Sequence, residues 1–199
     1  MGTRNVAAID LGAESGRVML ARFDGQQLAL QEVHRFPNRP LLLHGHRFWN
    51  MPALWNETLI GLRKAHQAAG TLDSVGVDTW GVDYGLVDSH GLLSGNPYQY
   101  RDHRTDGIME QVFARVPRDT LYRRTGIQFL PFNTLFQLYA HEQVQPGELA
   151  RAHRLLLIPD LLHCWLSGSQ VCERTNATTT QCWDPVAGEW AMDLLEQLA

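Results

Sequence analysis

An apolar strand that ends on an acid and runs into a glycine-rich turn opens the chain. Residues 6–9 are the apolar run, Asp10 follows it, and Gly12 and Gly16 flank the turn before a second apolar run at 18–23. Such a turn brings backbone N–H groups and a carboxylate together, a combination that can hold a phosphate and its Mg²⁺ ion. An ordinary glycine-containing β-hairpin explains the segment equally well, so both interpretations stay open at this point.

Two better-known phosphate motifs do not fit this turn. The P-loop pattern G-x-x-x-x-G-K-[ST] is absent, and no lysine follows the glycines. The spacing from Gly12 to Gly16 differs from G-x-G-x-x-G, and a strand follows where that motif needs a helix. The remaining interpretation is a phosphate-gripping β-hairpin, as in the superfamily of actin, Hsp70 and the sugar kinases.

The first half of the chain has the pattern of an α/β domain. Three strands with tight turns, a loop, a helix that Gly70 ends, and a buried strand are expected in that order, at residues 5–9, 16–23, 28–36, 37–47, 51–69 and 74–79. A strand at 82–87 pairs with the buried strand or follows it. This order predicts a ribonuclease H-like fold of the actin-like ATPase superfamily, with a β-β-β-α-β core.

The second half is predicted to be a mainly helical extension. Helices are expected at residues 105–116, 118–125, 133–145, 147–153, 159–167 and 190–199. We therefore expect one domain over 1–199, with the ribonuclease H-like core at about 1–100 and the helical part at about 101–199.

Composition narrows the classes of partner. The chain has 17 basic and 21 acidic residues, which gives a net charge of −4 and argues against nucleic acid. It lacks a long apolar run and a signal segment, so neither a membrane span nor export is expected and a cytoplasmic location is predicted. The three cysteines lack metal-site spacing and are expected to be reduced. His44 and His46 have few acids near them in sequence, which disfavours a metal site there.

A second polar cluster lies at residues 78–83, where an acid again ends a strand. Ligands of open α/β sheets bind beyond the carboxyl ends of strands, so Asp10 and this cluster are expected to share one cleft. There Trp80 offers a flat face to a sugar ring, Gly81 allows close backbone approach, and Asp83 accepts hydrogen bonds from vicinal hydroxyls. The alternative is structural: a core tryptophan, a turn glycine and a loop-capping aspartate.

Residues 100–105 carry further charged groups just before a predicted helix. Arg101 and Asp102 are expected to form a hydroxyl-binding pair at the rim of the cleft. In the structural alternative Asp102 is a helix cap and Arg104 is a solvated surface charge.

Taken together, these segments resemble the FGGY family of carbohydrate kinases, and within it the members that act on L-rhamnulose. The matching segments are DLGAESGR (10–17), DTWGVD (78–83), YRDHRT (100–105), GIQFLPFNT (126–134), IPDLL (158–162) and TNATTTQ (175–181). Family members have two ribonuclease H-like domains with the active site between them. The resemblance covers only the N-terminal domain, so the C-terminal domain is expected to be absent from this chain.

The resemblance implies transfer of the γ-phosphoryl group of ATP to O1 of L-rhamnulose, with Mg²⁺, in L-rhamnose breakdown. It assigns the metal to Asp10, the ATP phosphates to Ala13, Glu14, Ser15, Gly16 and Arg17, and the sugar to Gly81, Trp80, Asp83 and Arg101. Because an acid facing a triphosphate would repel it, the side chain of Glu14 is expected to point outward.

The resemblance places the catalytic base outside this chain. In the family it is an aspartate early in the second domain, in a His-Asp-Thr-like context, and no such motif occurs in residues 1–199. A general base typically contributes about 10²–10⁴ in rate. We therefore predict that the chain alone is not a competent kinase and that its partner is a complementary C-terminal domain.

Three other functions remain as alternatives. The chain fits a kinase of the same family that acts on another ketose or polyol, or a non-catalytic remnant that binds a sugar or a partner protein. An actin-like or Hsp70-like ATPase is disfavoured, because such a protein has no use for the sugar-facing segments at 78–83 and 100–105.

Overall fold

The computed structural model describes residues 2–198, and the chain divides into two compact units. The first, which we call the sheet unit, comprises residues 2–41 and 49–80. The second, the helical unit, comprises residues 42–48 and 81–198. The chain passes from one unit to the other after Leu41, after Phe48 and after Trp80.

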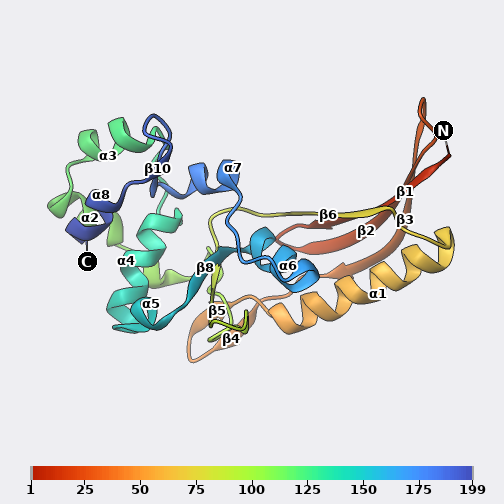
Figure 1. Ribbon diagram of the computed structural model, residues 1–199. Coiled ribbons are helices and arrows are strands. Elements are labelled where there is room, and N and C mark those ends of the chain that lie inside the picture. The colour runs from red at the N-terminus through yellow and green to blue at the C-terminus, as the bar shows by residue number, and fades with distance from the viewer. Residues whose placement is uncertain (1, 199) are drawn as a thin grey trace. The chain divides into compact units, whose positions relative to one another are not determined.

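The sheet unit is built on four hydrogen-bonded strands in the order β3-β2-β1-β6 (Figure 1). These are β1 (Arg4–Leu11), β2 (Ser15–Phe23), β3 (Leu28–Pro37) and β6 (Ser74–Thr79). The β1–β2 and β2–β3 pairs are antiparallel, whereas β6 is parallel to β1. With the helix that connects β3 to β6, this confirms the predicted β-β-β-α-β core.

That connecting helix is α1 (Met51–Ala69), which runs along the sheet in Figure 1. The side chain of Asn50 caps its first turn by accepting a hydrogen bond from Ala53 N–H, and Gly70 ends it in the left-handed region with φ 79°. Helix α1 packs on β2, β3 and β1. The contact is closest at Gly61, where an added Cβ would lie 2.3 Å from Cγ2 of Val18.

Strand β6 differs from the prediction of a buried strand. Most of its residues are exposed, including Val75 at 38%. Within residues 2–198, β6 pairs only with β1, and α1 packs on the other strands of the sheet. An apolar run such as Val-Gly-Val is typical of a buried central strand, but here it lies at the edge of the sheet.

Within the described residues, the helical unit contains three two-stranded sheets that the sequence did not predict. The segment 37–47 was expected to be a loop, yet β4 (Leu41–Leu43) and β5 (His46–Phe48) form a hairpin there. The expected strand at 82–87 is β7 (Tyr84–Val87), and it pairs antiparallel with β8 (Arg154–Leu157) and not with β6. The last hairpin is β9 (Trp183–Asp184) with β10 (Glu189–Trp190).

Helices account for most of the regular secondary structure in the described part of the helical unit. They are η1 (His103–Thr105), α2 (Ile108–Arg115), α3 (Arg118–Thr125), α4 (Thr134–Val144), α5 (Glu148–Arg151), α6 (Ile158–Ser167), α7 (Arg174–Ala177), η2 (Thr178–Thr180) and α8 (Met192–Leu198). The last two before α8 occupy the threonine run, which had no predicted structure. Buried residues of α2, α3, α4 and α8 form one apolar core, among them Val112, Leu121, Phe136 and Leu194. No helix within residues 2–198 has the length and apolar character needed to cross a bilayer.

Candidate functional site

The predicted phosphate turn is a tight loop between β1 and β2. Gly12 N–H donates to the carbonyl of Ser15 over 2.9 Å, which closes the loop. Within residues 2–198, the N–H groups of Ala13 and Glu14 donate no backbone hydrogen bond. The side chain of Glu14 is exposed, and its orientation away from a bound triphosphate stays a prediction. The turn therefore offers two backbone donors to an anion while its one acid faces solvent.

Asp10 and Arg17 lie directly opposite each other at the base of this turn. Nε and an NH₂ nitrogen of Arg17 each lie 2.7 Å from Oδ2 of Asp10, and both side chains are about half exposed. Asp78 pairs with Asp10 from the parallel strand β6, so all three side chains project from the same face of the sheet. The row presents carboxylates that suit a divalent cation beside a guanidinium that suits phosphate.

Gly16 is required at this turn for space. An added Cβ would lie 2.4 Å from Cζ of Phe36 and 2.7 Å from Cδ2 of Leu11, and both of these side chains are buried. The glycine therefore lets the aromatic ring of β3 close over the start of β2.

Asn38 fixes the turn, and sequence reasoning missed it. Its backbone N–H donates to the carbonyl of Glu14, and its Nδ2 donates to the carbonyl of Gly12, both over 2.9 Å. The residue is 4% exposed. It follows β3 in a segment rich in proline that was expected to be a plain loop, so only the tertiary contact identifies it.

Trp80 ends the sheet unit and packs on a buried neighbour. Its ring centroid lies 4.0 Å from that of Trp49, which is fully buried, while Trp80 itself is half-buried. The indole is thus held in place by the start of α1 and retains exposed surface.

The longer segment of the helical unit begins with a strained γ-turn at Gly81, Val82 and Asp83. The N–H of Asp83 donates to the carbonyl of Gly81 over 2.9 Å, and Val82 between them has φ 68°. A positive φ is a rare conformation for a β-branched residue, and γ-turns of this hand are strained. Helix α4 holds the strained carbonyl of Val82, which accepts from Oγ1 of Thr134 at 2.8 Å and from Nε2 of Gln137 at 3.3 Å.

Asp83 is fully buried and serves as a bridge inside the unit. Its Oδ1 accepts from Nε2 of Gln137 over 2.7 Å, and its Oδ2 accepts from the N–H of Tyr100 over 3.2 Å. The carboxylate therefore ties the γ-turn to the segment that carries Arg101. Its direct contact with a sugar stays a prediction.

The charged residues after Tyr100 take different roles. Arg101 is exposed, with its guanidinium 5.2 Å from the centroid of the Tyr100 ring. Asp102 is buried and caps η1 by accepting from Arg104 N–H, which is the capping alternative. The other part of that alternative, a solvated Arg104, does not hold: its side chain is 1% exposed, and its two terminal nitrogens donate to the carbonyl and Oε1 of Gln137 over 2.7 Å.

The predicted site residues therefore form two groups. Asp10, the turn with Arg17, and Trp80 lie in the sheet unit, where β1 and β6 end side by side. Gly81, Asp83 and Arg101 lie in the helical unit, joined through Asp83. A cleft shared by the two groups stays a prediction.

Comparison with known proteins gives the chain a family. Residues 5–199 match the N-terminal domain of the FGGY family of carbohydrate kinases. The rhamnulokinase of Pectobacterium atrosepticum is 48% identical over 200 residues, which cover 100% of this chain and 40% of that protein. The rhamnulokinase of Mannheimia succiniciproducens is 47% identical over 196 residues, which cover 98% of this chain and 41% of that protein.

Solved structures show the same fold. Xylulose kinase from Rhodospirillum rubrum superposes with a TM-score of 0.84 at 19% identity, over 98% of this chain and 41% of that one. Gluconate kinase from Lactobacillus acidophilus gives 0.85 at 16% identity, over 99% of this chain and 40% of that one. The chain belongs to the FGGY family of carbohydrate kinases, and it spans about 40% of the length of the curated relatives it matches.

Proposed function

We propose that this chain is the N-terminal part of a cytoplasmic kinase that transfers the γ-phosphoryl group of ATP to O1 of L-rhamnulose. One observation carries the proposal: proteins named rhamnulokinase are 47–48% identical to it over nearly its whole length. At that level of identity, agreement with kinases for one ketose favours the same substrate over another sugar or polyol.

The sheet unit is proposed to hold the phosphates. The N–H groups of Ala13 and Glu14, with Ser15 and Gly16, line the turn, and Arg17 supplies a positive charge that is already oriented by Asp10. The exposed carboxylate of Asp10 fits a hard cation such as Mg²⁺. When bound, Mg²⁺ neutralises the charge that develops on the phosphate oxygens.

The sugar is proposed to contact Trp80, Gly81 and Arg101. Trp80 retains exposed surface, and Gly81 and Arg101 are exposed, so each is accessible to a small polyol. Asp83 is buried, and it supports these contacts by fixing the γ-turn and the backbone of Tyr100. We thus propose that Asp83 orients the neighbouring backbone, in addition to the hydroxyl-binding role that the sequence suggested.

The chain is proposed to need a C-terminal domain for turnover. Positioning and charge neutralisation are two requirements of phosphoryl transfer, and the third is a base for the attacking hydroxyl. Residues 1–199 lack the His-Asp-Thr motif that the resemblance assigns to that base. We therefore expect the isolated chain to bind ligands without catalysing transfer.

A chimera tests the proposal. Residues 1–199 are fused to the part of the Pectobacterium atrosepticum rhamnulokinase that follows its matched segment, and ADP release is followed with Mg-ATP and a panel of ketoses and polyols. We expect turnover with L-rhamnulose, and at least about a hundredfold lower kcat/KM for Arg17→Ala. A folded chimera that prefers another sugar would refute the substrate, and turnover by residues 1–199 alone would refute the need for a second domain.

A further inference from the structure

The β4–β5 hairpin brings a histidine to a buried aspartate that is far away in sequence. Phe48 of β5 forms a β-bridge with Tyr98, and the N–H of Gln99 donates to the carbonyl of Arg47 over 2.9 Å. This pairing places His46 beside Asp102, although the two are 56 residues apart. The sequence argument against a metal site at His46 considered only acids near it in the chain, so it missed Asp102.

The carboxylate of Asp102 is held rigidly. Its Oδ2 accepts from Arg47 N–H over 2.7 Å, its Oδ1 accepts from Arg104 N–H over 3.0 Å, and its side chain is 1% exposed. The group is therefore an oxygen ligand held in one orientation.

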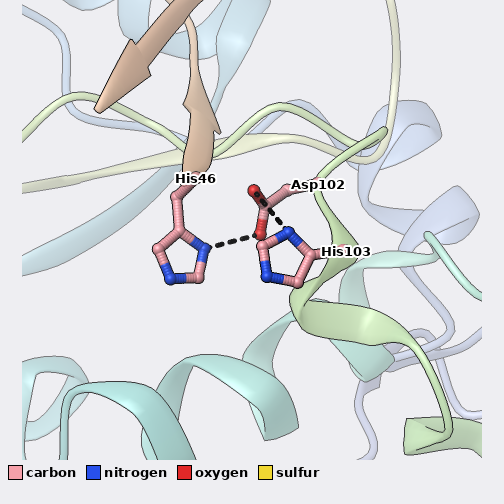
Figure 2. Close-up of side chains that lie close together, drawn as sticks. All are labelled: His46, Asp102 and His103. Carbon is pink, nitrogen blue, oxygen red and sulfur yellow. Dashed lines mark hydrogen bonds and ion pairs between the residues drawn. The ribbon is translucent and has the colours of Figure 1, made fainter. Parts of the chain in front are cut away.

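Two imidazoles flank this carboxylate (Figure 2). Nδ1 of His46 lies 3.1 Å from Oδ1, and Nδ1 of His103 lies 3.9 Å from Oδ2. The two rings are stacked, with centroids 4.9 Å apart and an interplanar angle of 9°. His46 is 25% exposed and His103 is 63% exposed, so solvent reaches the cluster from the side of His103.

We propose that His46, Asp102 and His103 bind a divalent transition-metal ion of the Zn²⁺ and Co²⁺ class. One ligand atom from each residue lies within 4.8 Å of the others. Zn²⁺ bonds to nitrogen and oxygen ligands at about 2.0–2.2 Å, which places tetrahedral ligands about 3.3–3.6 Å apart. To reach that distance, the 63% exposed ring of His103 must turn out of its stack on His46, so that its nitrogen lone pair points at the ion, and water completes the coordination.

The ligand set selects the class of ion. Two imidazoles with one carboxylate suit Zn²⁺, Co²⁺ and Ni²⁺, whereas Mg²⁺ and Ca²⁺ prefer oxygen ligands throughout. The peptide N–H groups of Arg47 and Arg104 hold the carboxylate in the way that outer hydrogen bonds orient metal ligands. The alternative is a hydrogen bond between His46 and Asp102 with His103 as a bystander.

A bound ion would join the hairpin to the segment that leads into η1. Residues 46 and 102–103 lie on these two pieces, and Arg101, a proposed sugar contact, directly precedes the metal-binding pair. Occupancy would therefore restrict the backbone beside Arg101. The metal site itself stands on the geometry of the three side chains and does not depend on the proposed sugar.

The test uses the tag-free full chain with CoCl₂ followed by visible absorption and ZnCl₂ followed by calorimetry. Wild type is expected to bind one equivalent with cobalt d–d bands, and His46→Gln and His103→Gln to lose at least about tenfold in affinity. His90→Gln, an exposed histidine of the same unit, is the matched control and should bind as wild type does.

His103→Gln is the decisive variant, because the side chain of His103 is 63% exposed. Without metal, this variant should therefore have the melting temperature of the wild type. Equal binding by wild type and His103→Gln, or no stoichiometric binding by wild type, would overturn the proposal. Loss in His46→Gln alone would favour the hydrogen-bonded pair and would likewise overturn it.

Discussion

Replacing Gly61 with alanine sets two opposing effects against each other. Gly61 lies in the interior of α1, where alanine is favoured over glycine by about 1 kcal/mol. The same residue faces Val18 of β2, and the added Cβ would lie 2.3 Å from Cγ2 and 2.8 Å from Cβ of that valine. Helix propensity therefore predicts stabilisation, and packing predicts the reverse.

Packing should prevail. Carbon atoms rest at about 3.5–4.0 Å, so the helix or the strand must move apart by roughly 1.2 Å to accommodate the methyl group. A rotamer change of Val18 does not help, because its own Cβ is also too close and the side chain is fully buried. Overpacking costs about 1–3 kcal/mol, and the fixed Cβ contact places this case near the upper end. After the helical gain, we expect a net loss of about 2 kcal/mol.

The assay is thermal unfolding followed by circular dichroism and tryptophan fluorescence. A loss of about 2 kcal/mol corresponds to a melting temperature lower by about 4–8 °C in a chain of this size. Gly76→Ala in β6 is the matched control, because an added Cβ there meets nothing within 4 Å. The double variant Val18→Ala/Gly61→Ala should be less destabilised than the sum of the single variants. A Gly61→Ala chain as stable as wild type would refute the reasoning.

Three further perturbations test other features. Val82→Gly should raise stability by about 1 kcal/mol over Val82→Ala, because it relieves a strain of about 1–3 kcal/mol and costs about 0.5–1 kcal/mol in entropy; equal melting temperatures would contradict the strained γ-turn. Asn38→Ala should lower stability by about 1 kcal/mol and weaken Mg-ATP binding, because Gly12 loses a hydrogen bond at the turn; unchanged urea and titration midpoints would exclude the clamp. Burial lowers the pKa of His141, so below about pH 6.5 the unfolded chain takes up a proton before the folded one, and the free energy of unfolding should decrease as the pH is lowered. In urea titrations from pH 7 to 5, the free energy of unfolding of His141→Gln should depend less steeply on pH than that of wild type, and an equally steep dependence would contradict this.

Local rules predicted the sheet unit well because its turns and helix ends carry their own signals. Gly70 ends α1, and Gly12 and Gly16 mark the turn between β1 and β2. These glycines act within a few residues of themselves. Their effect can therefore be read directly from the sequence.

Other features depend on contacts that the sequence does not display. Arg104 is buried with its terminal nitrogens hydrogen-bonded to two oxygens of Gln137, whereas a charged residue with no partner visible in the sequence is by default assigned to solvent. Val82 is β-branched, so no local rule predicts its positive φ; the hydrogen bonds from Thr134 and Gln137 that hold it come from a helix more than fifty residues away. Residue type suggested the candidate site residues, but it did not suggest the groups that orient them.

Within residues 2–198 the outer edge of β6 has no strand partner, which has a consequence for this stretch of chain in concentrated solution. A strand paired on one side only presents a row of backbone donors and acceptors that another strand can join. Gly76 has no side chain and the exposed Val75 is apolar, so neither hinders pairing with another strand, and Asp78 is the one charged residue of β6. The chain is therefore expected to self-associate through this edge as concentration rises, and a lysine introduced at Val75 should suppress it.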